Sequence, residues 1–168
     1  MSSAPQDPEA VLLVEDREAQ PVLSIRATVR IDEIAEKHGE SLRELWRSMQ
    51  ARGVTAVGPP FVRYHSFGKT ETDVEVGIPV AEPTAGQGRV AAGELPGGAA
   101  ISTWHFGAHD RLGEAYARLE AWLKGHGRQS AGAAWEVYWW IDPSTDPDPA
   151  TWPPPEEWRA ELVQPVAR

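Results

Sequence analysis

An internal repeat limits the folds that this chain can adopt. The segment PFVRY at 60–64 aligns with AWEVY at 134–138, and VEVGIPVA at 74–81 aligns with AELVQPVA at 160–167. A helix-like segment in the first half also maps onto one in the second half when 77 is added to its residue numbers. Three matches in the same order favour duplication over chance similarity. The offset grows from 74 to 86 between the two strand matches, which assigns a twelve-residue insertion to the Pro-rich segment 142–155.

Each repeat has the pattern strand, strand, helix, strand, strand. The helices are indicated by apolar residues at three- and four-residue spacing, and Gly53 and Gly125 stand where they should end. We therefore expect one α+β domain over 11–168, built from two pseudo-twofold-related repeats. The expected boundaries are 1–10 for a flexible N-terminal tail, 11–82 and 88–168 for the repeats, and 32–52 and 109–124 for the helices.

Charge and composition exclude several classes of protein. The chain of 168 residues has a net charge of −9 and no cluster of Lys and Arg, so we expect no direct binding to nucleic acid. No apolar run is long enough for a membrane span, and the N-terminus has no apolar signal core. We therefore expect no membrane partner and take the cytoplasm as the default location. Without cysteine, a thiolate metal site or a disulfide cannot form.

Motifs for common catalytic and cofactor chemistry are missing. The sequence contains no phosphate-binding P-loop, no dinucleotide-binding glycine pattern, no H-E-x-x-H and no G-x-S-x-G. His105 and His109 have the spacing of a ligand pair, but they straddle the predicted strand–helix junction at Gly107. We therefore expect neither a metal nor another cofactor.

The segment AAWEVYWWI at 133–141 is the most distinctive strand, because it places one acid among aromatic rings. Side chains alternate between the two faces of a strand. The apolar face, which we expect under the helices, holds Trp135, Val137, Trp139 and Ile141. The other face, which we expect to wall an open cleft, holds Glu136, Tyr138 and Trp140. The repeat places Tyr64 opposite Tyr138 across the pseudo-twofold, whereas Glu136 has Val62 as its equivalent.

Pattern alone leaves several of these residues open. Glu136 is either a solvated acid, a partner of Arg63 or Arg159 on a neighbouring strand, or one end of a binding site. Trp104 is as readily a core residue as a cleft residue. Tyr116, on the second predicted helix, is interpreted as core together with the helical tryptophans. The Pro-rich insertion is either a linker or a flap over the cleft.

Several motifs occur in the order of a known family. They are G-P-P-F-V-R-Y at 58–64, D-V-E-V-G-I-P-V at 73–80, L-P-G-G at 95–98, H-F-G at 105–107, W-E-V-Y at 135–138, D-P at 142–143 and E-W-R-A-E-L-V-Q-P-V at 157–166. Together they resemble the GyrI-like domain of the SOUL/GyrI-like superfamily, the effector-binding domain of AraC- and MerR-type multidrug regulators. The resemblance covers nearly the whole chain from Val11 onward.

The resemblance implies two βαββ-type units side by side, with a central groove for lipophilic, often cationic, drug-like molecules. It identifies Glu136 as the acid of that groove, and it suggests aromatic ligand contacts at Tyr138, Trp140, Tyr64 and Trp104. We therefore expect a stand-alone multidrug-binding protein, of the kind that serves in resistance. Because no helix-turn-helix precedes the domain, we expect no DNA regulation by this chain.

The family also suggests two alternatives. Some members are hydrolases that open cyclopropane rings of DNA-alkylating natural products. In that case Glu136 would be the general base, and Tyr138 or Tyr64 would donate a hydrogen bond to the developing oxyanion. Other members bind DNA gyrase and protect it from toxins, but no segment of this sequence points to a protein partner. Whether the chain is an enzyme stays open at this point.

Overall fold

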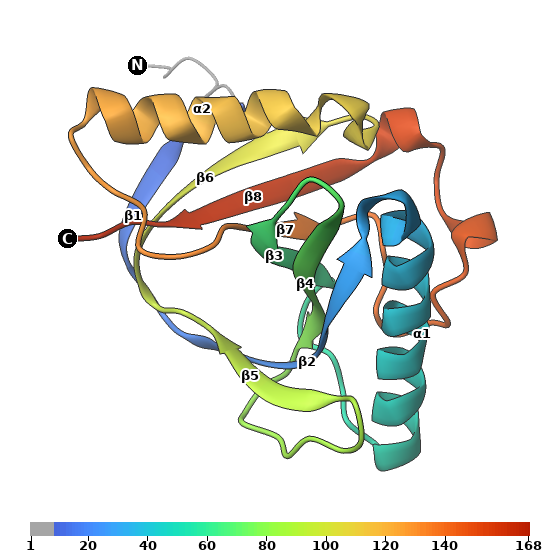
Figure 1. Cartoon of the computed structure of the whole chain (residues 1–168). Coiled ribbons are helices and arrows are strands. Elements are labelled where there is room, and N and C mark those ends of the chain that lie inside the picture. Colours follow the sequence, from blue (N-terminus) through green and yellow to red (C-terminus); the bar gives the residue numbers. More distant parts are fainter. Residues whose placement is uncertain (1–8) are drawn as a thin grey trace, which may run out of the picture.

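The computed structural model describes residues 9–168, so most of the tail predicted at 1–10 lies outside the described residues. Eight strands and two long helices follow the order predicted from the repeat (Figure 1). The elements are β1 Leu12–Arg17, β2 Gln20–Arg30, α1 Ile34–Arg52, β3 Phe61–Phe67, β4 Glu71–Pro79, β5 Ala91–Leu95, β6 Gly98–Phe106, α2 Leu112–Gly125, β7 Trp135–Tyr138 and β8 Arg159–Pro165. Short 3-10 turns are η1 Ile31–Glu33, η2 His109–Arg111, η3 Pro149–Thr151 and η4 Pro155–Glu157.

All eight strands form one antiparallel sheet in the order β1-β6-β8-β7-β3-β4-β2-β5. The equivalent strands of the two repeats are β1 and β5, β2 and β6, β3 and β7, and β4 and β8. Exchanging each strand for its equivalent gives the same strand order read backwards. A pseudo-twofold axis therefore passes between β3 and β7, which confirms the predicted repeat. The first strand of each repeat pairs with the second strand of the other repeat, β1 with β6 and β5 with β2, so the two repeats interlock.

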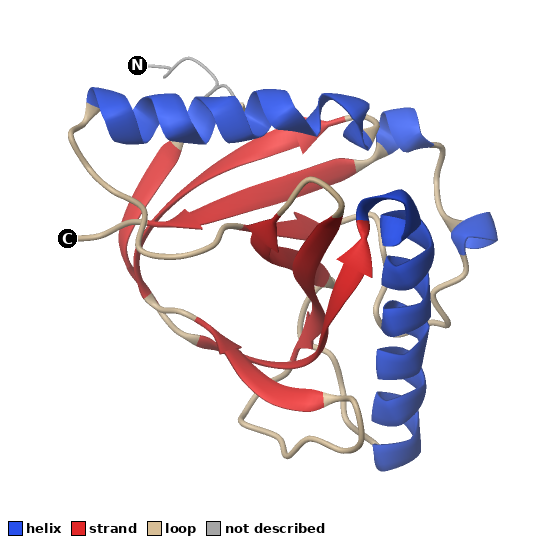
Figure 2. Ribbon diagram, viewed as in Figure 1, coloured by secondary structure: helices blue, strands red, loops and turns tan. Residues whose placement is uncertain are grey.

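Each helix packs on two strands of its own repeat, α1 on β2 and β4, and α2 on β6 and β8 (Figure 2). The predicted apolar spacing is what makes this possible, because Leu42, Leu45 and Met49 of α1 fall on one buried stripe. Gly53 ends α1 with a φ of 67°, the left-handed conformation that glycine adopts without strain. The central strands β3 and β7 lie between the two helices.

The helix face of the sheet carries a row of buried side chains that crosses six strands. In strand order the row is Ile25, Val76, Val62, Glu136, Leu162 and Thr103, because directly paired residues point to the same face. Glu136 is the one acid in this row and stands next to the pseudo-twofold axis, opposite Val62. The acid therefore lies on the side of the sheet that holds both helices.

The opposite face carries a second core, and the sheet curls around it (Figure 2). Its members are Val22, Phe61, Leu95, Ala100, Trp135 and Val163, with Val137 packed against them. The prediction that Trp135 and Val137 lie under the helices is therefore wrong, because both faces of β7 are buried and alternation does not tell them apart. Trp139 is not a core residue either: β7 ends at Tyr138, and Trp139 follows in a turn with 41% of its surface exposed. Ile141 packs in the helix-side core.

Within residues 9–168, neither helix combines the length and the apolarity that a membrane-spanning helix requires.

Candidate ligand-binding site

Glu136 is a buried carboxylate that is bonded by two phenols. Only 2% of its surface is exposed. Its Oε1 accepts a hydrogen bond from Tyr138 Oη at 2.7 Å, and its Oε2 accepts one from Tyr116 Oη at 2.5 Å. The cross-strand cations considered from the sequence are not its partners. Arg63 donates to the carbonyl of Ala133 and lies over the Trp135 ring on the other face, and Arg159 is exposed.

The environment of Glu136 favours the uncharged acid. Burial raises the pKa of Glu136, because the carboxylate loses its hydration. The hydrogen bonds from Tyr116 and Tyr138 oppose this rise, since they stabilise the charged form. Burial and the nearby carboxylate raise the pKa of both phenols, so they stay protonated and remain donors. A positive charge brought next to this acid would relieve the cost of holding it ionised.

The carboxylate lines a cavity of about 390 Å³, here called the Glu136 pocket. Its lining residues are Ile34, Tyr64, Phe67, Tyr116, Ala134 and Glu136. Glu136 is the one charged side chain among these six. The rings of Tyr64 and Phe67 meet edge to face at 5.5 Å, and Phe67 is 62% exposed at the rim. An aromatic pocket with a single acid is suited to an aromatic cation.

A second cavity of about 330 Å³ lies at the other end of the β3–β7 pair and is here called the indole chamber. It is lined by Ala35, His38, Gly39, Leu42, Pro60, Phe61, Val62, Val76, His109, Tyr138, Trp140, Ile141, Pro149, Trp152 and Trp158. The strand register places the two cavities at opposite ends of the β3–β7 pair. At the chamber end, the Tyr138 N–H donates to the carbonyl of Pro60, whereas Tyr64, which lines the Glu136 pocket, lies toward the other end. Tyr138 connects them: its ring lines the chamber and its hydroxyl bonds Glu136.

The Pro-rich insertion covers the indole chamber, not the Glu136 pocket. Pro149 and Trp152 of the insertion, together with Trp158 that follows it, line the chamber. An ion pair of 3.4 Å between Arg43 of α1 and Asp146 holds the insertion against the helix. Of the two interpretations left open by the sequence, a linker or a flap, the structure supports a cover over one end of the groove.

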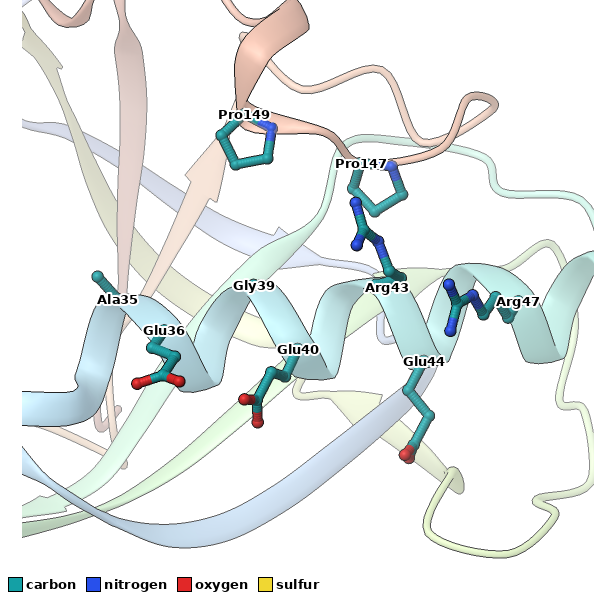
Figure 3. A pocket seen from close by; sticks show the side chains of 9 residues that line it. All are labelled: Ala35, Glu36, Gly39, Glu40, Arg43, Glu44, Arg47, Pro147 and Pro149. Atoms are coloured by element: carbon teal, nitrogen blue, oxygen red, sulfur yellow. The ribbon is translucent and has the colours of Figure 1, made fainter.

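A third cavity, of about 530 Å³, lies on the outer side of α1 beneath Pro147 and Pro149 (Figure 3). Its other side chains are mostly acids and arginines that project from the solvent side of the helix: Glu36, Glu40, Arg43, Glu44 and Arg47. Exposed charges of both signs are screened by water and salt. This cavity is therefore a weaker candidate than the Glu136 pocket, although it is larger.

The structure does not bring Trp104 to Glu136. Trp104 neighbours Thr103 on β6, and Thr103 belongs to the row of Glu136, so Trp104 points to the opposite face. Its ring stacks on Phe106 at 6.4 Å and contacts Trp139 at 5.8 Å. Of the two possibilities left open by the sequence, neither the helix-side core nor the groove holds this tryptophan.

Tyr116 is the site residue that the sequence analysis missed, because its place on an apolar helix stripe suggested core packing. The repeat contains a signal for it. Subtracting the helix offset of 77 maps Tyr116 onto Gly39, and subtracting the strand offset of 74 maps Glu136 onto Val62. The hydrogen-bonded pair thus occupies two positions at which the second repeat departs in chemistry from the first.

Two histidines of the indole chamber make the fold sensitive to acid. The pKa of His38 is lowered to about 4 by burial and by His109, and the pKa of His109 is lowered to about 4 by burial and by His105. Since these folded-state values lie below the ordinary value of 6.5, the unfolded chain takes up protons first as the pH falls. The stability that the neutral rings contribute is therefore complete above about pH 6.5 and is lost as the pH falls toward 4.

We expect His38→Phe to reduce this acid-induced loss. Between pH 7 and pH 4, the drop in the free energy of unfolding should be smaller than in the unaltered protein by on the order of 2 kcal/mol. Glu136, whose raised pKa acts in the opposite direction, contributes equally to both proteins. Urea denaturation at the two pH values measures the effect, with His126→Phe at the exposed end of α2 as control. An equal drop in His38→Phe and the unaltered protein would contradict the prediction.

Comparison with solved structures shows the same fold in other proteins. EcmrR in complex with DNA has a TM-score of 0.76 and 23% identity, and the match covers 94% of this chain but 57% of that one. The C-terminal domain of EcmrR alone has a TM-score of 0.72, with 94% of this chain and 97% of that domain covered. The chain thus spans little more than half of the longer EcmrR chain.

Two further structures are more distant in sequence. A hydrolase from Listeria innocua has a TM-score of 0.63 and 13% identity, covering 98% of this chain and 94% of that one. SAV2435 bound to tetraphenylphosphonium has a TM-score of 0.52 and 13% identity, covering 94% and 93%. No curated protein shows a significant match in sequence. The family described as the GyrI-like small molecule binding domain matches over residues 14–167, nearly the whole chain. The chain therefore belongs to the GyrI-like family of small-molecule-binding domains.

Proposed function

We propose that the protein binds lipophilic aromatic cations in the groove between α1 and α2, with Glu136 as the counter-charge. One observation carries the proposal: a buried carboxylate, hydrogen-bonded by two phenols, is the single charge in the lining of an aromatic pocket. Burial makes its ionised form costly, and a bound cation would offset that cost. The tetraphenylphosphonium bound to SAV2435, which shares the fold, supports the same class of ligand here.

The tyrosines would contact different parts of the ligand. Tyr64 and Tyr116 line the Glu136 pocket and would present their rings to the cation. Each such contact contributes about 0.5 to 2 kcal/mol, which adds to the charge pairing with Glu136 without imposing strict shape selection. Tyr138 and Trp140 face the indole chamber and would contact a ligand long enough to extend past Glu136. Trp104, on the other face of the sheet, has no part in this proposal.

Charge should decide which ligands bind. We expect tetraphenylphosphonium to bind at least about ten times more tightly than triphenylphosphine oxide, which has three of the same rings and no charge. We also expect its affinity to fall as the pH is lowered through the raised pKa of Glu136, because protonation removes the counter-charge. Isothermal titration calorimetry from about pH 8 to about pH 5 measures both effects. Equal affinity for the two compounds, or a flat pH profile for the cation, would refute the proposal.

A second function is supported by the same geometry. Glu136 would act as general base toward a water molecule, and Tyr64, which lines the same pocket, would donate a hydrogen bond to the oxygen that becomes negative as a cyclopropane ring opens. The hydrolase from Listeria innocua has the same fold. Incubation with a cyclopropane-bearing DNA-alkylating natural product separates the two functions. Ring-opened product in excess over protein would favour the hydrolase, and tight binding without product would favour the binding protein.

A further inference from the structure

We propose that the indole chamber is a second ligand site, which takes an uncharged aromatic molecule that carries carbonyl or hydroxyl oxygens. The site lies at the opposite end of the β3–β7 pair from the Glu136 pocket, behind the ring of Tyr138. It needs neither cation binding nor turnover at Glu136, so it goes beyond the function proposed above.

The walls of the chamber suit a flat ring. Trp140 and Trp158 stack in parallel, with 4.6 Å between ring centroids and 4° between planes. Trp152 meets Trp158 edge to face at 6.5 Å, and His109 stands edge-on to both stacked indoles at 5.2 and 5.3 Å. His109 belongs to η2, Trp140 to the turn after β7, and Trp152 to the Pro-rich insertion, whereas Trp158 lies between η4 and β8. The insertion therefore contributes one of the four rings that enclose the chamber.

The lining offers no counter-charge to a charged ligand. None of the residues that line the chamber is an aspartate, glutamate, lysine or arginine. A charged group that entered would lose its hydration without gaining a counter-charge. The two histidines do not supply one near neutral pH, because the pKa of each is about 4. An uncharged molecule is therefore the class of ligand that this lining favours.

Three buried ring nitrogens of the chamber lack a hydrogen-bond partner, which indicates a polar atom on the ligand. Nε2 of His38, Nε2 of His109 and Nε1 of Trp140 are buried and have no hydrogen-bond partner within the described chain. Buried polar groups are nearly always paired, so three around one cavity point to a missing partner. The indole N–H can only donate, and each neutral imidazole can donate or accept. The ligand should therefore offer at least one hydrogen-bond acceptor, for which we assign a carbonyl or hydroxyl oxygen.

The remaining buried nitrogens without a hydrogen bond do not gather in this way. They lie singly on Trp46, on Arg52 and on Arg43, whose Nε is ion-paired with Asp146. Trp46 of α1 lines a different cavity, together with Met49 and Pro143. Replacing Trp46 by Phe thus removes an unpaired indole N–H without touching the chamber, which makes it the matched control.

Flavone, an uncharged planar ketone, is the probe, and 2-phenylnaphthalene is its counterpart without oxygen. We expect flavone to bind at least about tenfold more tightly than the hydrocarbon, which is the effect of one buried hydrogen bond. Trp140→Phe, which removes the indole N–H, and Trp152→Ala, which opens the cover, should each weaken flavone binding about tenfold. Trp46→Phe should bind flavone as the unaltered protein does. Calorimetric or fluorescence titration of the full chain gives these affinities.

Three results would overturn the proposal: no flavone binding, equal affinity for flavone and 2-phenylnaphthalene, or unaltered flavone affinity in both Trp140→Phe and Trp152→Ala. Equal affinity for the two probes would mean that ordered water satisfies the nitrogens. Trp152 lies in a surface segment outside the helices and strands, so its variant still tests the site if Trp140→Phe fails to fold. Tetraphenylphosphonium titrated into the same proteins separates the two sites: cation binding without flavone binding by the unaltered protein would refute the chamber and leave the Glu136 proposal standing.

Discussion

Glu136→Gln is expected to weaken the binding of tetraphenylphosphonium about 100-fold and to leave the fold intact. The substitution keeps the shape of the side chain and one acceptor oxygen for Tyr116 or Tyr138, but it removes the charge. Removing one partner of a desolvated charge pair typically costs about 2 to 5 kcal/mol in binding, and each 1.4 kcal/mol is a factor of about ten. Because burial raises the pKa of Glu136, its charged form costs the folded state stability, so removing the charge should not unfold the protein. Calorimetric titration of both proteins at the same pH measures the loss.

Glu161→Gln is the matched control for this experiment. Glu161 lies on β8 and pairs with Val137, so its side chain is on the face of the sheet opposite Glu136. The same chemical change there should leave cation binding unaltered. Triphenylphosphine oxide should bind Glu136→Gln as well as it binds the unaltered protein, which isolates the contribution of charge. Undiminished affinity for the cation in Glu136→Gln would rule out the ion pair.

The architecture could be predicted because duplication acts on the whole fold at once. Short aligned segments such as those at 60–64 and 134–138 fix the order of strands and helices in both halves, and a duplicated unit implies a pseudo-twofold axis. Duplication also drew attention to Glu136, because it does not explain an acid that replaces Val62 in an otherwise repeated strand. The resemblance to the GyrI-like family, and not the repeat, assigned this acid to the groove. The proposed binding of a cation requires a carboxylate that is shielded from water, and Glu136 is buried.

The sequence could not reveal contacts between segments that are distant in the chain, because neither segment contains a pattern that identifies its neighbour. Polar turns join β1 to β2 and β5 to β6, yet each first strand pairs across the repeats. Tyr116 satisfies every requirement of a core residue on a helix, and its hydroxyl shows its role only when α2 is placed over Glu136. The sequence also left the face of Trp104 open, because it does not show which side of the sheet the helices cover.

The tryptophan beside Glu136 serves the fold instead of the ligand. Trp135 is 2% exposed and packs with Phe61 and Val163 in the second core, whereas Glu136 points to the helix side. We expect Trp135→Ala to lower the free energy of unfolding by about 3 to 5 kcal/mol, through lost burial and the cavity it leaves. Domains of this kind have about 5 to 15 kcal/mol of stability, so a folded population should remain measurable by urea denaturation.

Trp139→Ala is the comparison for Trp135→Ala, because it removes a tryptophan that lies outside the second core. Trp139 is also a tryptophan of the aromatic segment, but it is 41% exposed in the turn after β7, so its loss should cost no more than about 1 kcal/mol. The folded fraction of Trp135→Ala should bind tetraphenylphosphonium with unaltered affinity, because the pocket lies on the other face of β7. Equal stability losses in the two variants would mean that the fold does not depend on the second core. Cation affinity that falls with Trp135→Ala would mean that the two faces of β7 are coupled, and that the motif cannot be divided between fold and ligand.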